Sequence, residues 1–406
     1  MSTSDTVSIR GVAAGGDGVG TLPDGRTVFV PRTAPGDTVR LRSVRRHARF
    51  ARAEIAEVVE PGPGRVDPPC PHYLRDRCGS CQLQHLDSAS QQGVRRTIVG
   101  DAMRRIARLD REDPPMLGNG PPFGYRARIT LTVRHGVIGY HRHGAPDQII
   151  EITSCLLASE PVRTLHAAVR RGRRHLPRDA EQVSLREDAE GGLHVVVRTA
   201  GEGTWTDAAA LAAELPDGVH LWWHPAGGAA RVVAGSADPF PATVFAQVNP
   251  AVAGAVRRAA LAALGPVSGA RVWDLYAGIG ESTAALADAG AQVASVERDP
   301  RAVRHAVGVG PAGPDRRVGD VADHAPRLPA PDLVLTNPPR LGMEESVTAV
   351  LRESGAGRLV YISCDPATLA RDIGRLSPAY RLADLTAWDQ FPQTAHVECV
   401  ATLERR

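Results

Sequence analysis

The sequence predicts an α/β fold that ends in a doubly wound parallel sheet, preceded by a small β-barrel and a central α+β region. Three observations support this prediction. Short alternating apolar stretches, separated by turn residues, run from Val7 to Glu60, as in a small antiparallel barrel. Strand patterns and an arginine-rich helix follow. From Arg271 onward strand, loop and helix alternate, which is typical of a parallel sheet covered by helices. We therefore predict domains at residues 1–62, 65–245 and 246–406.

The composition of the chain indicates a globular protein. The 406 residues are 43% hydrophobic, enough for two or three compact cores. No long apolar run and no signal-peptide pattern is present, so we expect a cytoplasmic protein with no membrane partner. The net charge of +3 is too small to indicate nucleic-acid binding by itself, although all 48 basic residues are arginine. We expect a monomer, and the sequence identifies no protein partner.

The predicted barrel contains a sequence motif that resembles a known domain. Its segment from Gly18 to Pro31, followed by Pro35-Gly-Asp37, resembles the TRAM domain, a relative of the oligonucleotide-binding fold that occurs on RNA-modifying enzymes. The resemblance implies that residues 1–62 bind RNA. The alternative is a generic five-stranded barrel that binds nothing. Pro61-Gly-Pro-Gly64 then reads as a linker.

Three cysteines stand close together at the start of the central region. The spacing Cys70-x7-Cys78-x2-Cys81 suits a metal in a reducing compartment, and Cys155 is the candidate for a fourth ligand. The two remaining cysteines lie in the last domain. Spacing alone leaves both an iron–sulfur cluster and zinc with four thiolates open.

The rest of the central region predicts paired strands. They lie at residues 125–133, 136–140, 149–152, 194–198 and 219–223, with a helix at 161–175. A further helix at 251–264 opens the last domain.

The first strand of the parallel sheet, Val272–Tyr276, leads into a glycine turn, Ala277-Gly-Ile-Gly280, and then a helix. Such glycines let the backbone approach a ligand at a helix N-terminus. The next strand ends at Glu297, which is placed to bind a ribose diol. Asp320 follows the third strand and is placed to accept from an adenine amine.

The ligand of this sheet is better read as S-adenosylmethionine than as a nicotinamide dinucleotide. The third glycine of a dinucleotide fingerprint falls on Thr283, and the fourth strand ends in Asn337-Pro-Pro-Arg340, which hydride transfer does not explain. The alternative, a doubly wound sheet that binds no ligand, requires every strand-end signal to be a coincidence.

Cys364 and Glu398 are candidates for a catalytic nucleophile and a general base. Cys364 follows the fifth strand, at the sheet edge where such folds bind ligands, and a helix expected from Ala367 has an N-terminal dipole that would favour a thiolate. Glu398 precedes the last strand and is a candidate general base. Cys399, in an alternating strand, reads as a core residue.

The chain resembles the uracil-5 RNA methyltransferases over nearly its whole length. The resemblance is carried by Cys78-Gly-Ser-Cys-Gln-Leu-Gln-His85, Phe245-Ala-Gln-Val-Asn-Pro250, Asp274-Leu-Tyr-Ala-Gly-Ile-Gly280, Asn337-Pro-Pro-Arg340, Ser363-Cys-Asp-Pro-Ala-Thr-Leu-Ala-Arg-Asp372 and Phe391-Pro-Gln-Thr-Ala-His-Val-Glu398. Together with the TRAM-like N-terminal region, these motifs make the chain similar to the branch of the family that acts on 23S ribosomal RNA. Members of that branch carry a 4Fe-4S cluster.

The resemblance implies a class I methyltransferase sheet and assigns roles to residues. The cluster ligands would be Cys70, Cys78, Cys81 and Cys155. The methyl-donor site would include Gln247, Tyr276, Gly278, Gly280, Glu281, Glu297, Asp320 and Asn337. Three features depart from the family pattern: Asn337 stands where Asp is common, Glu281 where Asn is frequent, and the first cysteine gap is longer.

The predicted activity is methylation of carbon 5 of a uridine in RNA through a covalent adduct with Cys364, after which Glu398 removes a proton. Ribosomal RNA is favoured over the tRNA T-loop. Carbon 5 of cytosine is a further alternative. From another class, the chain could be a noncatalytic RNA-binding or cluster protein that keeps a relic methyltransferase sheet, a reading that Asn337 and Glu281 support.

Overall fold

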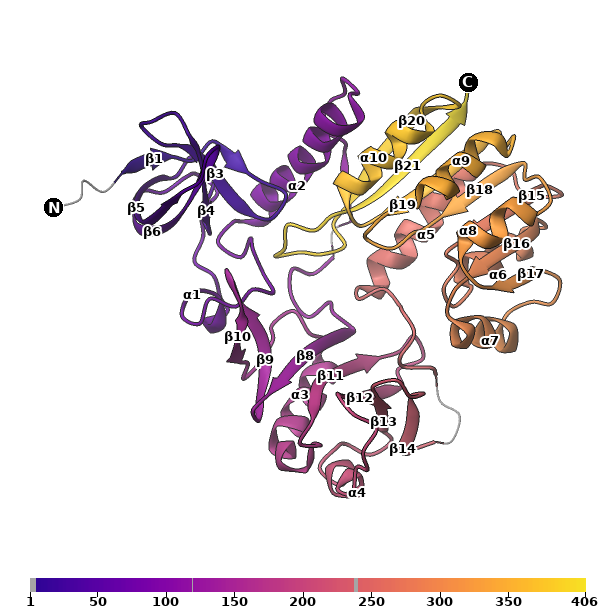
Figure 1. Ribbon diagram of the computed structural model, residues 1–406, viewed down its shortest axis with the longest axis horizontal. Coiled ribbons are helices and arrows are strands. Elements are labelled where there is room, and N and C mark those ends of the chain that lie inside the picture. The colour runs from indigo at the N-terminus through magenta and orange to yellow at the C-terminus, as the bar shows by residue number, and fades with distance from the viewer. Residues whose placement is uncertain (1–4, 119, 237–239) are drawn as a thin grey trace.

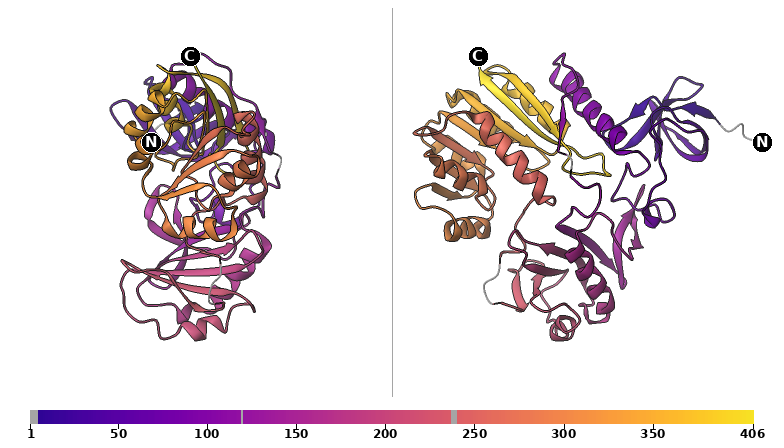
Figure 2. Two further views of the ribbon diagram at one scale, coloured as in Figure 1. Left: turned by 90° about the vertical axis from the view of Figure 1, so that its right-hand side faces the viewer. Right: turned by 180° about the vertical axis from the view of Figure 1, so that it is seen from behind.

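The computed structural model describes residues 5–118, 120–236 and 240–406, which contain three sheets of six, seven and eight strands. Figure 1 shows the N-terminal sheet, the central sheet and the C-terminal sheet as three separate parts, and Figure 2 shows the same arrangement from two further sides. Among these residues, none of the helices combines the length and the apolar character that crossing a membrane requires.

The N-terminal sheet is curled around a small core of its own. Its strands are β1 (Thr6–Ser8), β2 (Gly11–Val12), β3 (Asp17–Thr21), β4 (Thr27–Pro31), β5 (Thr38–Arg46) and β6 (Phe50–Glu60), in the order β1-β5-β6-β4-β3-β2. Alternate residues such as Val28 and Val30 are fully buried, as period-two strands require. Strand β4 pairs with β6 in parallel, which differs from the predicted antiparallel barrel. The other strand pairs of this sheet are antiparallel.

The central sheet has helices on one face. Its strands are β8 (Arg128–Arg134), β9 (Val137–Arg142), β10 (Ala145–Glu151), β11 (Ala180–Glu187), β12 (Leu193–Thr199), β13 (His220–Pro225) and β14 (Arg231–Ala234), in the order β10-β9-β8-β11-β12-β13-β14. Helices α3 (Glu160–Arg171) and α4 (Ala208–Ala212) share its buried core, which also contains Cys78, Cys81 and Cys155. The short helix α1 (Pro71–Leu74) lies between the first two cysteines of the group.

The C-terminal sheet has the predicted α/β architecture. Seven of its strands are β15 (Arg271–Leu275), β16 (Gln292–Glu297), β17 (Asp315–Val318), β18 (Leu333–Thr336), β19 (Arg358–Ser363), β20 (Tyr380–Trp388) and β21 (Glu398–Arg405), in the order β17-β16-β15-β18-β19-β21-β20. The eighth is the short strand β7 (Met116–Leu117), beside β20. The first five in this order are parallel, and β21 and β20 add an antiparallel edge.

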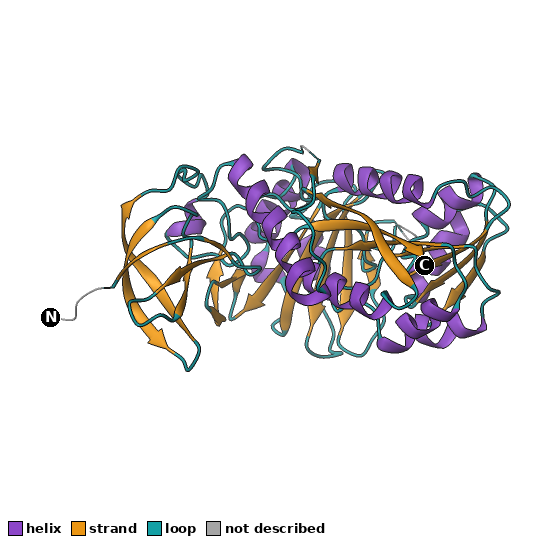
Figure 3. Ribbon diagram, turned by 90° about the horizontal axis from the view of Figure 1, so that it is seen from above, coloured by secondary structure: helices purple, strands orange, loops and turns teal. Residues whose placement is uncertain are grey.

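Helices cover both faces of this sheet, as Figure 3 shows from above. Val272 points to the core formed with α5 (Pro250–Leu264) and α6 (Glu281–Asp288), whereas its neighbour Trp273 points to the opposite core. That second core is closed by α8 (Val321–His324), α9 (Glu345–Glu353) and α10 (Pro366–Leu376). Helix α7 (Pro300–Val309) lies between β16 and β17 in the chain.

One segment before the central sheet packs against the C-terminal sheet. Helix α2 (Ser88–Ala102) and the π-helical turn η1 (Met103–Ala107) place Val99 and Met103 in the same core as Ile373 of α10. Strand β7 (Met116–Leu117) then pairs with β20 at the sheet edge. Figure 1 shows α2 beside α10. The sequence did not predict this, because the packing joins segments far apart in the chain.

Candidate active site

The turn after β15 is built for close approach of a ligand. Tyr276, Gly278 and Gly280 all have positive φ, of 61°, 57° and 81°. At Gly280 a Cβ atom would come within 2.7 Å of the Cβ of Ala306, so a larger residue would not fit without a shift. Tyr276 holds this conformation without being glycine, which is strained backbone of the kind that clusters at ligand sites.

A buried carboxylate fixes this turn to the following helix. Asp274, at 2% exposure, accepts hydrogen bonds from the hydroxyl of Ser282 at 2.8 Å and the hydroxyl of Thr283 at 2.6 Å. Burial raises the pKa of Asp274 to about 6, and the two hydroxyls oppose that rise. Sequence reasoning noted Thr283 only as a missing glycine and did not find this role.

The structure brings Gly278, Gly280 and Glu297 together around one pocket of about 180 Å³. Each carboxylate oxygen of Glu297 accepts a backbone N–H, from Gly278 at 2.9 Å and from Asp299 at 2.8 Å. The carboxylate therefore holds the glycine turn in place, and its remaining lone pairs stay available to a ligand hydroxyl.

The other residues predicted for the donor site are not part of the lining of this pocket. Glu281 forms an ion pair with Arg257 at 2.7 Å, and Asp320 lies 3.8 Å from Arg298; both carboxylate side chains are about half exposed. The backbone N–H of Asn337 donates to the carbonyl of Leu275 at 3.1 Å, which sets Asn337 at the end of β18 next to Tyr276.

Gln247 belongs to a group of amides that sequence reasoning missed. Its side-chain oxygen accepts from the amide of Gln390 at 3.4 Å, and the Asn249 amide donates to the Gln390 carbonyl at 3.2 Å. Both Gln390 and Asn249 are buried. Their only signal in the sequence was that Asn249 lies in the motif around Gln247 and that Gln390 directly precedes the motif ending at Glu398.

The predicted nucleophile and base face each other. Strands β19 and β21 are antiparallel, and their last pair at this end is Ser363 with Cys399. Continuing this register by one residue sets Cys364 beside Glu398, and the Glu398 charge acts on the Cys364 thiol. The register of two strands thus joins residues that are separated by a helix and a strand in the chain.

The electrostatics of this pair are set by burial. Glu398 is 2% exposed, and its Oε2 atom has no hydrogen-bond partner among the residues that the structure describes. Burial raises the pKa of Glu398 to about 8, which Arg340 opposes. Burial, and then the Glu398 charge, also raise the pKa of Cys364, while Arg340 again acts in the opposite direction.

The expectation that the helix dipole favours a Cys364 thiolate is wrong in its net effect. The backbone N–H groups of Ala367 and Thr368 at the start of α10 donate to the carboxylate of Asp365, at 3.0 and 2.9 Å. A carboxylate therefore already caps this helix end, and burial dominates the pKa of Cys364. Cys399 is fully buried, which confirms its reading as a core residue.

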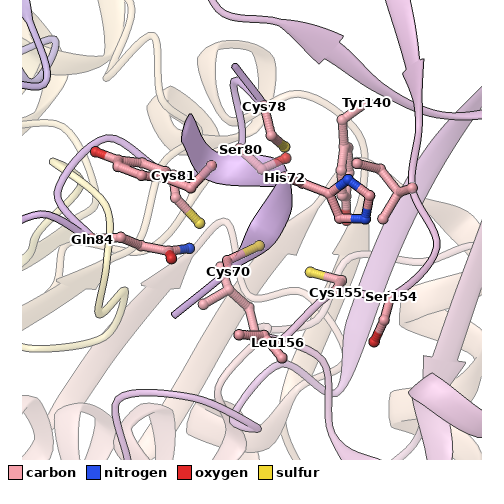
Figure 4. A pocket seen from close by; sticks show the side chains of 13 residues that line it. Cys70, His72, Cys78, Ser80, Cys81, Gln84, Tyr140, Ser154, Cys155 and Leu156 are labelled. Carbon is pink, nitrogen blue, oxygen red and sulfur yellow. The ribbon is translucent and has the colours of Figure 1, made fainter. Parts of the chain in front are cut away.

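The four cysteines of the central region line one pocket of about 320 Å³, and Figure 4 shows their sulfur atoms around it together with Gln84. Burial raises the pKa of Cys78 to about 11 and also raises those of Cys70 and Cys81. Within residues 5–118, 120–236 and 240–406, no group of three or more His, Cys, Asp or Glu side chains is arranged to hold a metal ion.

Comparisons with known proteins identify relatives of the chain. A family profile described as tRNA (Uracil-5-)-methyltransferase matches residues 330–406, which contain Cys364 and Glu398. The 23S rRNA (uracil(1939)-C(5))-methyltransferase RlmD of Chromohalobacter salexigens is 33% identical, over 100% of this chain and 90% of that protein. An uncharacterized RNA methyltransferase of Streptomyces coelicolor is also 33% identical, over 98% of this chain and 92% of the relative.

A solved structure shows the same fold. The Pyrococcus abyssi tRNA (uracil-54, C5)-methyltransferase, in complex with S-adenosyl-L-homocysteine, matches with a TM-score of 0.75 and 22% identity, over 99% of this chain and 100% of that one. The predicted fold class, with a class I methyltransferase sheet at the C-terminus, is confirmed. The full-length identity to the curated relatives also confirms the resemblance: the chain belongs to the family of RNA uracil-5 methyltransferases, enzymes that use S-adenosylmethionine to methylate carbon 5 of uracil in RNA.

Proposed function

We propose that this protein methylates a uridine of 23S ribosomal RNA through a covalent intermediate on Cys364. The observation that carries the covalent route is the strand register that sets Cys364 opposite Glu398. The choice of ribosomal RNA is supported by the relative from Chromohalobacter salexigens, whose name specifies uracil 1939 of 23S rRNA and which this chain matches from end to end.

The chemistry follows from the electronics of uracil. Carbon 5 is a poor nucleophile, so the Cys364 thiolate adds to carbon 6 and the ring electrons move to carbon 5 as an enolate. Carbon 5 then attacks the sulfonium methyl, and the donor sulfur keeps the bonding electron pair and leaves as S-adenosylhomocysteine. Glu398 takes the proton from carbon 5, the carbon 5–carbon 6 double bond forms again, and the thiolate leaves. The target base must stand out of its stack for this, which favours a loop or single strand.

The donor site is proposed around the glycine turn. Gly278 and Gly280 would allow the donor to approach the backbone, and Glu297 would accept from the ribose hydroxyls. The residues assigned to the rim of this site are Gln247, Tyr276, Glu281, Asp320 and Asn337. Replacing Glu297 with Gln should weaken S-adenosylhomocysteine binding in calorimetry, while Asp315→Asn, on the exposed start of the neighbouring strand, should not.

Two variants test the covalent route. Cys364→Ala should abolish methylation of RNA, and Glu398→Gln should accumulate an RNA adduct that survives denaturing electrophoresis. Retained methylation by Cys364→Ala would exclude a cysteine adduct. Prompt product release by Glu398→Gln would remove Glu398 from the role of base.

A tRNA uridine is the second candidate substrate. It is favoured by the description of the family profile and by the fold of the Pyrococcus abyssi enzyme. Methylating a 23S rRNA transcript and a tRNA transcript side by side, and mapping the modified nucleoside by mass spectrometry, separates the two. The same map distinguishes 5-methyluridine from 5-methylcytidine.

We also propose that Cys70, Cys78, Cys81 and Cys155 hold a 4Fe-4S cluster. The four side chains line one pocket, and Figure 4 shows their sulfur atoms around it, which is the arrangement that a thiolate-ligated group requires. The cluster is proposed from the family resemblance, and zinc with four thiolates is the alternative ligand of the same cysteines. Iron and acid-labile sulfide should be lost in Cys81→Ser and kept in Cys399→Ser. Zinc without sulfide would contradict the cluster.

The N-terminal sheet is proposed as an RNA-binding TRAM-like domain. The hairpin of β5 and β6 exposes several arginines, and among the described residues Arg45 and Arg49 are not part of an ion pair, whereas Arg40 and Arg52 face carboxylates. Unpaired arginines on a hairpin suit binding to phosphates. Reversing the charge at Arg45 and Arg49 should weaken RNA binding and reduce its salt dependence by about one unit of slope for each phosphate that the variant no longer binds.

A further inference from the structure

The loop that leads into Glu398, residues 389–397, is held by segments about 300 positions earlier in the chain. The backbone N–H groups of Gln82 and Leu83, directly after Cys81, both donate to the carbonyl oxygen of Gln393, at 3.1 and 3.0 Å. The cysteine segment thus contacts the loop five residues before Glu398.

A reciprocal amide pair reinforces this contact. The side chain of Gln91 on α2 donates to the Gln393 side-chain oxygen at 3.0 Å and accepts from the Gln393 backbone N–H at 2.8 Å. Both glutamines are buried, at 3% and 4% exposure. Gln393 also has φ of 70°, a conformation that costs about 1–3 kcal/mol in residues other than glycine and persists only where its surroundings hold it.

Further anchors hold the loop on both sides of Gln393. Arg95, 1% exposed, forms an ion pair with Asp389 at 2.8 Å and donates to the carbonyl of Thr394 at 3.2 Å. The hydroxyl of Tyr125 donates to the carbonyl of Pro392 at 2.9 Å. The loop is therefore fixed from α2, from the cysteine segment and from the start of the central sheet.

Glu398 depends on this loop because its own carboxylate is weakly held. One carboxylate oxygen has no hydrogen-bond partner among the described residues, and Glu398 is the first residue of β21, paired with Trp388. The direction of its side chain therefore depends on that pairing and on the loop that leads into it. We propose that Gln91 is a positioning residue for the reaction, which through its amide pair with Gln393 fixes the loop that presents Glu398 to carbon 5. This inference rests on the proposed roles of Cys364 and Glu398.

The role predicts which step fails when the pair is removed. Addition of Cys364 to carbon 6 and transfer of the methyl group do not require the base. Removal of the carbon 5 proton does, so a displaced Glu398 leaves enzyme and methylated RNA joined. Because small misplacements of a reacting group cost up to about 100-fold, turnover should fall between about tenfold and 100-fold.

The test uses the full-length protein with Gln91→Leu, which removes the amide and keeps a similar volume. The control is Tyr380→Phe, which removes a buried hydroxyl that donates to the carbonyls of Leu351 and Ala356, away from the loop. Gln91→Leu should slow turnover, leave the single-turnover rate of methyl transfer unchanged, and raise the fraction of enzyme in denaturation-resistant RNA adduct; Tyr380→Phe should change none of these. If Gln91→Leu does not fold, Gln393→Asn tests the same pair, because Asn tolerates positive φ but is too short to reach Gln91.

The inference is overturned if Gln91→Leu accumulates no more adduct than Tyr380→Phe. It is also overturned if Gln91→Leu loses the single-turnover rate of methyl transfer, because that loss would indicate general disruption of the site. Cys364→Ala and Glu398→Gln, run in parallel, separate this failure from failure of the proposed function. If Glu398→Gln traps adduct and Gln91→Leu does not, only the positioning role is wrong. If Cys364→Ala still methylates RNA, the covalent route itself fails.

Discussion

The C-terminal sheet buries two carboxylates, and it treats them differently. Asp274 at the end of β15 and Glu398 at the start of β21 are each 2% exposed. Asp274 accepts from two hydroxyls, at 2.8 and 2.6 Å. Within the described chain, Glu398 keeps one oxygen without a partner. Burial raises both pKa values, to about 6 for Asp274 and about 8 for Glu398.

The difference separates a structural carboxylate from the one that we propose as the base. Hydroxyl donors stabilise the charged form of Asp274, so its hydrogen bonds can tie the glycine turn to α6. Glu398 lacks such donors, so its ionised form is unstable and takes up a proton readily. That property suits a base whose task is to accept a proton from carbon 5. Four measurements test this difference between Asp274 and Glu398.

The largest expected effect is a loss of turnover when Glu398 is replaced, which we do not expect when Asp274 is replaced. Glu398→Gln should lower turnover by at least about 100-fold, because general-base catalysis contributes about 10²–10⁴-fold. Asp274→Asn should instead raise the KM for S-adenosylmethionine, since it loosens the turn rather than the base. Steady-state kinetics with saturating RNA measures both. Equal losses of turnover in the two variants would erase the distinction.

The second effect is the pH dependence of turnover. The base must be ionised, so the rate at which the methylated adduct breaks down should rise with pH up to the Glu398 pKa of about 8 and level off above it. The earlier addition step depends separately on the Cys364 thiol, whose pKa is raised by burial. Each unit below that pKa should cost about tenfold when proton removal limits the rate. A rate profile from pH 6 to 9 measures this, with donor binding followed separately. A profile that levels off near pH 6 would point to Asp274 instead.

The third effect is on stability, with a sign opposite to that of most core substitutions. The pKa of Glu398 in the folded protein lies above its ordinary value of 4.5, so ionisation favours the unfolded chain as the pH rises from 4.5 to 8. The wild-type carboxylate therefore destabilises the fold by about 1.4 kcal/mol for each pH unit in that window. Glu398→Gln should raise the free energy of unfolding at pH 8 and change it little at pH 4.5. Denaturant titrations at the two values test this, and a variant less stable at pH 8 would contradict it.

The pair Cys364 and Glu398 could be predicted from the sequence because each lies beside a strand with a strong local pattern. The parallel strands were predicted within one or two residues for the same reason, since continuous apolar runs between turns carry their own signal. What joined the two residues, the register of β19 with β21, required only that the last strand enter the same sheet.

The polar interactions that support the site could not be predicted in this way. Gln91 and Gln393 are 302 positions apart, and neither stands in a periodic pattern, so only the folded chain identifies them as partners. The packing of α2 on α10 is equally non-local. The sequence reveals the helix start beside Cys364 but not how deeply the thiol is buried, and burial is the largest cause of its raised pKa.

The smallest effect should come from one hydroxyl of the structural carboxylate. Thr283 is fully buried and donates to Asp274 at 2.6 Å. Thr283→Val keeps the branched shape and removes the donor, so it should destabilise the fold by about 1–3 kcal/mol, the range for hydrogen bonds to buried or charged groups. With one donor fewer, the ionised form of Asp274 is less favoured, so the destabilisation should be larger at pH 8 than at pH 5. Turnover at saturating donor should be retained, because the hydroxyl supports the turn and lies outside the chemistry of Cys364 and Glu398. A loss of turnover as large as that of Glu398→Gln would show that both carboxylates serve the reaction.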